Sequence, residues 1–91
     1  MARDFFWIAS RCVAAAEQHL GPIDVLVNNA GVYAHGSVDR LDALVFDHTL
    51  AVNLRGPFLM ARAVLPGMKS RRRGHVVNVA STAALRGFAG G

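Results

Sequence analysis

The sequence has little or none of several features on which whole classes of protein depend. Its single cysteine, Cys12, cannot form an internal disulfide and fits a reducing compartment. The longest apolar run near the start, Phe5 to Ala9, is too short for the core of a signal peptide or for a membrane span. The four histidines show no metal-ligand spacing, and there is no repeat or low-complexity tract. These absences predict a cytoplasmic protein with no metal site and no association with a membrane.

Positive charge is in excess, but it is concentrated in one place. The formal net charge is +4, and much of the excess lies between Lys69 and Arg73, just ahead of Gly74. No aromatic residues are interleaved with these cations, and no helix-turn-helix or zinc spacing accompanies them. A solvated turn between a helix and a strand is therefore the preferred interpretation, and no nucleic-acid partner is expected. The alternative, a nucleic-acid binder, predicts salt-dependent binding to duplex DNA.

What is present is the composition of one small globular domain, with 53% apolar and 18% charged residues in a chain of 91. Residues 1–9 carry no clear boundary signal. Apolar residues at helical spacing, together with several alanines, predict a helix over 10–20. Gly21 and Pro22 are the expected stop for that helix. The apolar, β-branched run 23–27 then predicts a strand buried on both faces.

The segment after this strand predicts a loop and then the start of a second helix. Residues 32–40 have the composition of a loop at the ligand-binding end of a sheet, where Tyr33 and His35 are candidates for substrate contact. Asp39 is a plausible N-cap for a helix that begins near Leu41.

The second helix is predicted to be long, over 41–68, and apolar on two sides. One stripe comprises Leu41, Val45, Val52, Leu59 and Ala63, and a second, on the opposite side, comprises Leu50, Leu54, Phe58 and Leu65. A helix that is apolar on two sides is covered on two sides. The sheet provides one cover, and further protein or a second subunit provides the other. We therefore expect a homo-oligomer formed through helix 41–68.

Pro57 lies inside this helix and has no backbone N–H. The carbonyl that loses its intrahelical donor is that of Asn53, four residues earlier. Together with Gly56, this predicts a bend over 53–57, with the Asn53 carbonyl free to bind water.

A second buried strand is predicted over 75–80, and its order in the chain predicts how it pairs. Because a long helix separates the two strands, they run parallel and end at the same edge of the sheet. Small and polar residues follow both strands, Asn28 to Gly31 after the first and Ser81 after the second. Asn28 and Asn29 can hydrogen-bond across the gap between the strands. Their convergence predicts a ligand site at this edge.

Four blocks of this chain, in this order and spacing, resemble the short-chain dehydrogenase/reductase family. They are Asp24 to Gly31, Asn53 to Phe58, Pro66 to Met68 and Gly74 to Ser81, and the resemblance extends over about residues 10–88. It implies an α/β fold, a partial Rossmann-type doubly wound parallel sheet with the order helix, strand, long bent helix, strand. Residues 1–91 would then form a single partial NAD- or NADP-binding domain, in which 1–9 are unmatched.

The resemblance also implies an activity and a set of site residues. The activity is that of an oxidoreductase that uses NAD or NADP to interconvert an alcohol and a ketone by hydride transfer. Asn53, through a main-chain carbonyl that holds a water, and Ser81, through a hydroxyl bonded to the reacting oxygen, would be catalytic. The cofactor-binding residues would be Asn28, Asn29, Ala30 and Gly31.

Two motifs of that family are absent from these 91 residues. They are the Gly-rich turn that seats the cofactor pyrophosphate and the catalytic Tyr-x-x-x-Lys pair; the only tyrosine, Tyr33, has no lysine four positions later. Without a general acid, hydride transfer lacks its partner step. We therefore expect a central fragment of a dehydrogenase that is inactive alone. The alternative is a non-catalytic oligomerisation module that uses helix 41–68.

Overall fold

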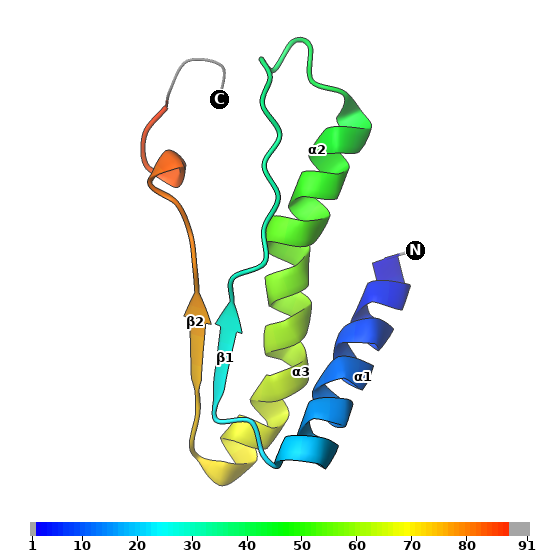
Figure 1. The fold of residues 1–91 in the computed structure, drawn as a ribbon, viewed down its shortest axis with the longest axis vertical. Coiled ribbons are helices and arrows are strands. Elements are labelled where there is room, and N and C mark those ends of the chain that lie inside the picture. The colour runs from blue at the N-terminus through cyan, green and yellow to red at the C-terminus, as the bar shows by residue number, and fades with distance from the viewer. Residues whose placement is uncertain (1, 88–91) are drawn as a thin grey trace.

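The computed structural model describes residues 2–87, with side chains from Trp7 onward, and has the predicted order of elements (Figure 1). Along the chain these are α1 (Ala2–Leu20), β1 (Val25–Asn28), α2 (Ala43–Leu50), a π-helical turn (Ala51–Arg55), α3 (Gly56–Arg71), β2 (His75–Asn78) and a 3₁₀ turn (Thr82–Ala84). Strand, long helix and parallel strand in this order confirm the partial Rossmann-type α/β fold.

The first helix begins at Ala2, eight residues before the predicted start. Packing and one local contact explain the difference. Ala9 and Val13 are 7% and 4% exposed, so the helix continues upstream along the same buried face. One turn apart, the Arg11 guanidinium lies 4.8 Å from the centroid of the Trp7 ring, a cation–π pair that the helix itself brings together. The side chains of Phe5 and Phe6 lie outside the described residues.

The helix ends where the sequence predicts. Gly21 adopts φ +90°, and its N–H donates to the Glu17 carbonyl at 2.9 Å. This left-handed conformation is one that glycine adopts without steric cost, and Pro22 then prevents the helix from continuing.

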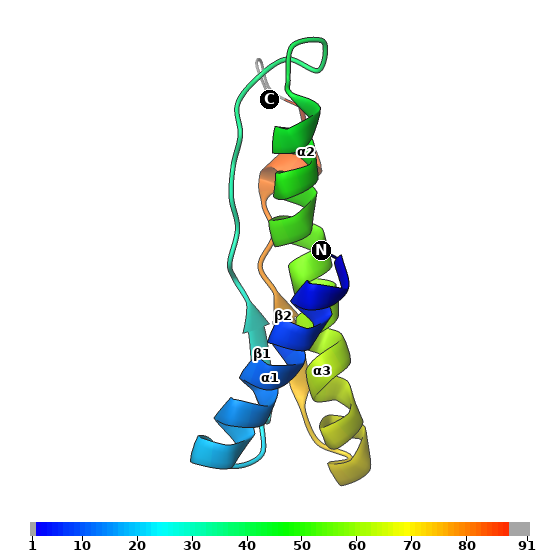
Figure 2. The same cartoon turned by 90° about the vertical axis from the view of Figure 1, so that its right-hand side faces the viewer.

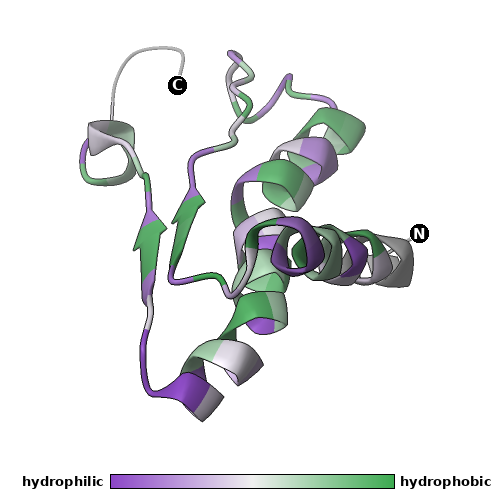
Figure 3. Cartoon of the chain, turned by 60° about the horizontal axis from the view of Figure 1, so that its bottom comes forward, coloured by the Kyte–Doolittle hydropathy of each residue, from purple (hydrophilic) through white to green (hydrophobic). Residues whose placement is uncertain are grey.

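The two strands pair in parallel with Val25 opposite His75 and Asn28 opposite Asn78. Burial on both faces, which the apolar runs predict, is wrong for the described chain. Val25 and Val27 are 53% and 55% exposed, and Val77 is 45% exposed. The reason is that α1 and α3 pack on the same face of the sheet. Figure 3 shows both strands as hydrophobic segments with hydrophilic residues where they end.

The core lies between that one face and the two helices. Val13 of α1 packs with Val64 and Met68 of α3, and Leu26 and Val76 reach this cluster from the sheet. Within residues 2–87, no element covers the opposite face of the strands. The helix layer of the predicted doubly wound sheet is therefore present on one side only.

The long helix runs from Ala43 to Arg71 as one rod whose direction changes only gently at the π-helical turn (Figures 1 and 2). Its N-cap is Asp42, whose carboxylate accepts from the Leu44 N–H at 2.8 Å. The cap predicted at Asp39 is therefore wrong. Residues 38–40 form a turn instead, in which the Arg40 and Leu41 N–H groups donate to the Ser37 carbonyl.

Asp42→Ala is expected to lower the free energy of unfolding by about 1 kcal/mol, the usual value of an N-cap side chain. Asp39→Ala removes the same charge from a nearby exposed position and is expected to change it by less than about 0.5 kcal/mol. Urea unfolding followed by circular dichroism measures both. Equal effects of the two substitutions would contradict the assignment of the cap.

The residues of α3 that are buried agree with the predicted stripes only in part. Leu59, in the first predicted stripe, is 3% exposed, but the other buried residues of α3 are Val64 and Met68, which belong to neither stripe. Ala63, also of the first stripe, packs against the core cluster, so that stripe is confirmed after the turn, and the burial of Val64 and Met68 follows from the packing of α1 against α3.

The second predicted stripe is exposed. Leu50, Leu54, Phe58 and Leu65 are between 42% and 66% exposed. The accessible surface of 7382 Å² exceeds the roughly 5100 Å² of a compact monomer of 9.7 kDa. The radius of gyration, 15.8 Å, likewise exceeds the roughly 12 Å of a compact domain of this length. Much apolar surface is thus left without a cover in the described chain. No helix within residues 2–87 has the length and apolarity to cross a bilayer.

The basic segment at the end of α3 binds to the residues just before β1. The Arg71 guanidinium donates to the Ile23 carbonyl at 2.7 Å, and Arg73 lies 3.5 Å from the Asp24 carboxylate. These contacts use part of the local positive charge to join the two ends of the strand–helix–strand unit.

Candidate functional site

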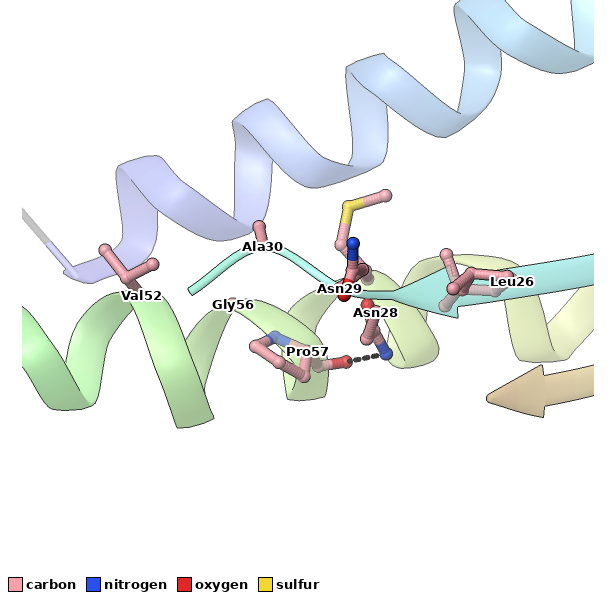
Figure 4. Close-up of a pocket in the computed structure, with 9 residues that line it drawn as sticks. Leu26, Asn28, Asn29, Ala30, Val52, Gly56 and Pro57 are labelled. Atoms are coloured by element: carbon pink, nitrogen blue, oxygen red, sulfur yellow. Dashed lines mark hydrogen bonds between the residues drawn. The ribbon is translucent and has the colours of Figure 1, made fainter. Parts of the chain in front are cut away.

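The carboxyl ends of the two strands are joined by side chains. The Asn28 amide donates to Asn78 Oδ1 at 2.9 Å, across the parallel pair, as the sequence predicts, whereas the Asn29 side chain makes no such bond within residues 2–87. The same Nδ2 lies 3.4 Å from the Pro57 carbonyl oxygen, at the start of α3 (Figure 4). Asn28 therefore connects both strands and the long helix at the edge where a ligand site is expected.

Asn53, in the π-helical turn, holds the chain that follows β1. Its Oδ1 accepts from the Val32 N–H and its Nδ2 donates to the Val32 carbonyl, both at 2.8 Å. One planar amide thus satisfies both backbone groups of one residue, as a neighbouring strand would. A Cβ added to Gly31 would lie 3.4 Å from Asn53 Oδ1, so a small residue suits this position.

The backbone around Asn53 departs from a regular helix in the way that Pro57 requires. Gly56 donates its N–H to the Ala51 carbonyl, five residues back, so the helix widens before the proline. Pro57 has no N–H to donate to the Asn53 carbonyl. The structure thus places the predicted irregularity over Ala51–Arg55, as a π-helical turn rather than a sharp bend over 53–57.

Ser81 stands just beyond β2 and caps a short turn. Its Oγ accepts from the Ala83 N–H at 3.1 Å, at the N-terminus of the 3₁₀ turn Thr82–Ala84. This bond orients the hydroxyl and leaves its proton able to donate. The ladder continues past the strand, because the Val79 N–H donates to the Asn28 carbonyl at 3.0 Å, and this positions Ser81 beside the end of β1.

These residues share three neighbouring cavities. One, of about 240 Å³, lies between the end of β1 and the π-helical turn (Figure 4) and is lined by Leu26, Val27, Asn28, Asn29, Ala30, Val52, Gly56, Pro57 and Met60. A second, of about 520 Å³, is lined by residues that include Asn28, Ala30, Asn53, Asn78 and Ser81. A third, of about 820 Å³, is lined by Val32, Tyr33, Asn53, Ser81, Thr82, Ala83, Arg86 and Gly87.

The structure therefore brings together the site residues predicted from the sequence. Asn53 and Ser81 line the second and third cavities together. Asn28 and Ala30 line the first and second, Asn29 lines the first, and Gly31 lies against Asn53. Convergence of both strand ends at one edge, as parallel pairing requires, is confirmed.

The two loop residues proposed for substrate contact are placed differently from each other. Tyr33 lines the third cavity, whereas His35 is not among its lining residues. The Tyr33 hydroxyl and His35 Nδ1 are 2.9 Å apart, with the rings edge to face. His35 therefore contacts Tyr33 and does not line the cavity.

Sequence reasoning missed Arg86 and the Val32 backbone. Arg86 follows the 3₁₀ turn and lines the third cavity, but it belongs to a stretch of small residues with no periodicity from which to place it. Val32 binds the Asn53 amide through its backbone N–H and carbonyl, and the identity of a residue does not reveal such a backbone contact. Within the part of the chain that the structure describes, no three histidine, cysteine or acidic side chains gather closely enough to hold a metal ion.

Comparison with known proteins relates this arrangement to a family. The sequence profile of the short chain dehydrogenases matches residues 8–91. 2-(S)-hydroxypropyl-CoM dehydrogenase 3 of Xanthobacter autotrophicus is 45% identical over 76 residues, which are 84% of this chain and 30% of that protein. Trans-4-hydroxycyclohexanecarboxylate dehydrogenase of Sinomonas cyclohexanicum is 42% identical over 82 residues, 90% of this chain and 30% of that protein.

A solved structure is similar over almost the whole chain. The crystal structure of serine dehydrogenase from Escherichia coli superposes with a TM-score of 0.84 at 32% identity, covering 93% of this chain and 40% of that one. The chain spans about a third of the length of the curated relatives it matches.

Proposed function

This chain belongs to the short-chain dehydrogenase family, and from that premise we propose that it forms part of the active site of an NAD- or NADP-dependent oxidoreductase. The reaction is the interconversion of an alcohol and a ketone by hydride transfer. The observation that carries the proposal is the convergence of Asn53 and the Ser81 hydroxyl on shared cavities beyond the ends of two parallel strands. That edge is where ligands bind in open parallel sheets.

Ser81 is proposed to be catalytic because its hydroxyl is oriented before any substrate binds. The Ala83 N–H donates to Oγ, so the remaining proton can be directed at the oxygen of an alcohol or ketone. A donor placed in advance where negative charge develops stabilises the transition state without reorganising. The bond from Ala83 also polarises the hydroxyl and strengthens it as a donor.

Asn53 is proposed to act through its main chain. Two hydrogen bonds to Val32 hold its side chain, and this fixes the backbone of the π-helical turn. Pro57 cannot donate to the Asn53 carbonyl, and a carbonyl oxygen has two lone pairs, so in this proposal that oxygen accepts from a water in the cavity. In this proposal the side chain positions the residue and the carbonyl takes part in proton transfer.

The residues around the first cavity fit one side of a dinucleotide. Ala30 and Gly56 leave room close to the backbone, and the Asn28 and Asn29 amides provide polar groups at its wall. We propose that Asn28, Asn29, Ala30 and Gly31 line the nucleoside side of NAD or NADP, which when bound would accept or supply the hydride. No Gly-rich turn for its phosphates occurs in these 91 residues. The cytoplasmic location expected from the sequence remains a prediction.

The 91 residues by themselves are expected to show no turnover with NAD, NADP and a panel of secondary alcohols. They contain one tyrosine, Tyr33, in the loop before the long helix, and one lysine, Lys69, in its last turn, so the two do not form a Tyr-x-x-x-Lys pair. A general acid for the carbonyl oxygen is therefore lacking. Absorbance of the reduced cofactor at millimolar substrate measures turnover. Robust activity would show that these residues are catalytically sufficient.

The proposal is tested by transplanting residues 8–87 into the Escherichia coli serine dehydrogenase in place of its matching segment. The TM-score of 0.84 shows that the two backbones follow a similar path over this region, which is the basis for the exchange. If the segment supplies functional Asn53 and Ser81, the chimera oxidises an alcohol with concomitant reduction of its cofactor. A folded chimera that binds cofactor but has no turnover would contradict the proposal.

A second candidate function is pairing with another copy of this chain. The outer face of the long helix, which we define as Leu50, Leu54, Phe58 and Leu65, is apolar and exposed, and its first three residues line a groove of about 470 Å³. An exposed apolar row of this kind is stabilised when a partner removes it from water. We propose a homo-oligomer formed through this face, in which the chain acts as a non-catalytic module.

Leu54→Glu is expected to weaken self-association at least tenfold, because each copy buries a leucine and the substitution places like charges at the contact. Sedimentation equilibrium of the wild-type and variant chains measures the dissociation constant. Val38→Glu, at a loop residue that is 94% exposed, adds the same charge away from the outer face and is the control. A monomeric wild-type chain, or equal effects of the two substitutions, would contradict the pairing.

A further inference from the structure

The third cavity has one charged residue in its wall. Arg86 lines it together with the Ser81 hydroxyl, and no carboxylate is among its lining residues. The remaining wall is neutral: Val32, Ala83 and Gly87 present no titratable side chain, and the Tyr33 hydroxyl is paired with His35. A ligand in this cavity therefore meets the hydroxyls of Ser81 and Thr82 and a single guanidinium.

Arg86 differs from most of the other arginines whose side chains the structure describes. Arg11 lies over Trp7, Arg71 binds the Ile23 carbonyl, and Arg73 pairs with Asp24. Arg55 and Arg62 also have partners. Within residues 2–87, the Arg86 side chain makes no hydrogen bond or ion pair, as is also true of Arg40 and Arg72. Of these three residues, only Arg86 lines a cavity beside Ser81.

We propose that Arg86 selects substrates that carry a carboxylate at a distance from the reacting alcohol or ketone. The inference rests on the proposed function, in which Ser81 holds the reacting oxygen. The rigid guanidinium fork matches a carboxylate through two parallel N–H···O bonds, whereas a neutral amide in the same position accepts less strongly. A hydroxy acid or keto acid can place its oxygen at Ser81 and its carboxylate at Arg86, within one cavity of about 820 Å³.

The Tyr33–His35 pair supports this division of the cavity. With its hydroxyl paired to the imidazole at 2.9 Å, Tyr33 offers its ring to the carbon skeleton of the substrate. The carboxylate is thereby directed to the wall that carries Arg86. In this proposal Arg86, after the 3₁₀ turn, sets the substrate class. Ser81, the N-cap of the turn, sets the position of the reacting oxygen.

The test compares 3-hydroxybutyrate with its neutral amide, 3-hydroxybutyramide, by titration into the ¹⁵N-labelled chain. We expect the acid to shift the backbone signals of Arg86, Ser81 and Tyr33, and to bind about fivefold more tightly than the amide. Fivefold is the ratio expected of one solvent-accessible charge pair of about 1 kcal/mol. Arg86→Gln should abolish the difference and Arg86→Lys should retain part of it. Arg72→Gln, with the same loss of charge at the far end of α3, should leave it unchanged.

Equal binding of acid and amide, no binding of either, or equal effects of Arg86→Gln and Arg72→Gln would overturn the proposal. A second measurement uses the chimera, in which Arg86→Gln should lower the ratio of kcat/KM for acid over amide about fivefold. An unchanged ratio in an active chimera overturns the role of Arg86 and leaves the proposed function standing. If the chimera is inactive but the labelled chain still binds the acid more tightly than the amide, the proposed function is contradicted and the role of Arg86 stands.

Discussion

Ser81→Ala is expected to lower kcat of the chimera by a factor of about a hundred to a thousand. This is the usual cost of removing one preorganised donor from the oxygen at which charge develops. The substitution removes only a hydroxyl, and the structure gives that hydroxyl one partner within the described chain, the Ala83 N–H. Because Ser81 is exposed at a short turn, the fold should survive its loss. Cofactor binding is expected to stay within about twofold.

The effect on kcat separates a catalytic hydroxyl from a structural one. If Ser81 only capped the 3₁₀ turn, the substitution would cost a few tenths to about 1 kcal/mol of stability and leave kcat almost unchanged. Ser70→Ala makes the same chemical change at an exposed position of α3 and serves as the matched control. Steady-state kinetics with saturating cofactor, together with thermal unfolding, measure both quantities. A Ser81→Ala chimera with wild-type kcat would remove Ser81 from the proposed mechanism.

Gly74→Ala is expected to destabilise the described chain by about 3 kcal/mol or more. Gly74 adopts φ +150°, a conformation that residues with a Cβ rarely adopt. A Cβ there would also meet the Met68 side chain, with Cγ and Sδ at 2.5 Å. Met68 is 5% exposed and belongs to the core, so it has little room to move. Overpacking of this kind costs about 1–3 kcal/mol in addition to the backbone strain.

Two further variants separate backbone strain from steric overlap. Gly21 adopts φ +90°, and a Cβ added there would have nothing within 4 Å, so Gly21→Ala should show the backbone cost alone, about 1–2 kcal/mol. In a Met68→Ala background, the added cost of Gly74→Ala should fall towards that of Gly21→Ala, because the overlapping atoms are gone. Urea unfolding of the single and double variants measures these differences. Additive effects of Gly74→Ala and Met68→Ala would contradict the overlap.

The marginal core is the reason that such substitutions have large consequences. Among the side chains that the structure describes, the buried hydrophobic residues are Ala9 and Val13 of α1 and Leu59, Val64 and Met68 of α3. Since the opposite face of the sheet and the outer face of the long helix are both exposed, little burial remains to offset chain entropy. A loss of about 3 kcal/mol is thus a large part of any stability the chain possesses.

Several features followed from local sequence because the physics that determines them is local. Gly21 and Pro22 end α1 through their own backbone preferences. The β-branched runs form strands at their predicted places, within two residues at each end. A long helix between them requires parallel pairing, and parallel pairing brings Asn28 and Ser81 to one edge. The ligand edge of the fold was therefore predictable without coordinates.

Other features depend on contacts between segments far apart in the chain. Hydrophobic periodicity, which reports only local spacing, does not predict them. Val64 and Met68 are buried because α1 packs against α3, although regular spacing places them outside both apolar stripes. The Asn53 amide meets the Val32 backbone 21 residues away, and a backbone partner is invisible in a sequence.

The amino-acid sequence by itself determined the order of elements, the parallel direction of the strands and the residues that stand at their ends, because each follows from short-range conformational preference and one topological rule. Only the tertiary structure decided which face of each element is buried, how far α1 extends and that Arg86 shares a cavity with Ser81. These depend on the packing of whole segments, whose free energy is set by surfaces that meet only after the chain has folded.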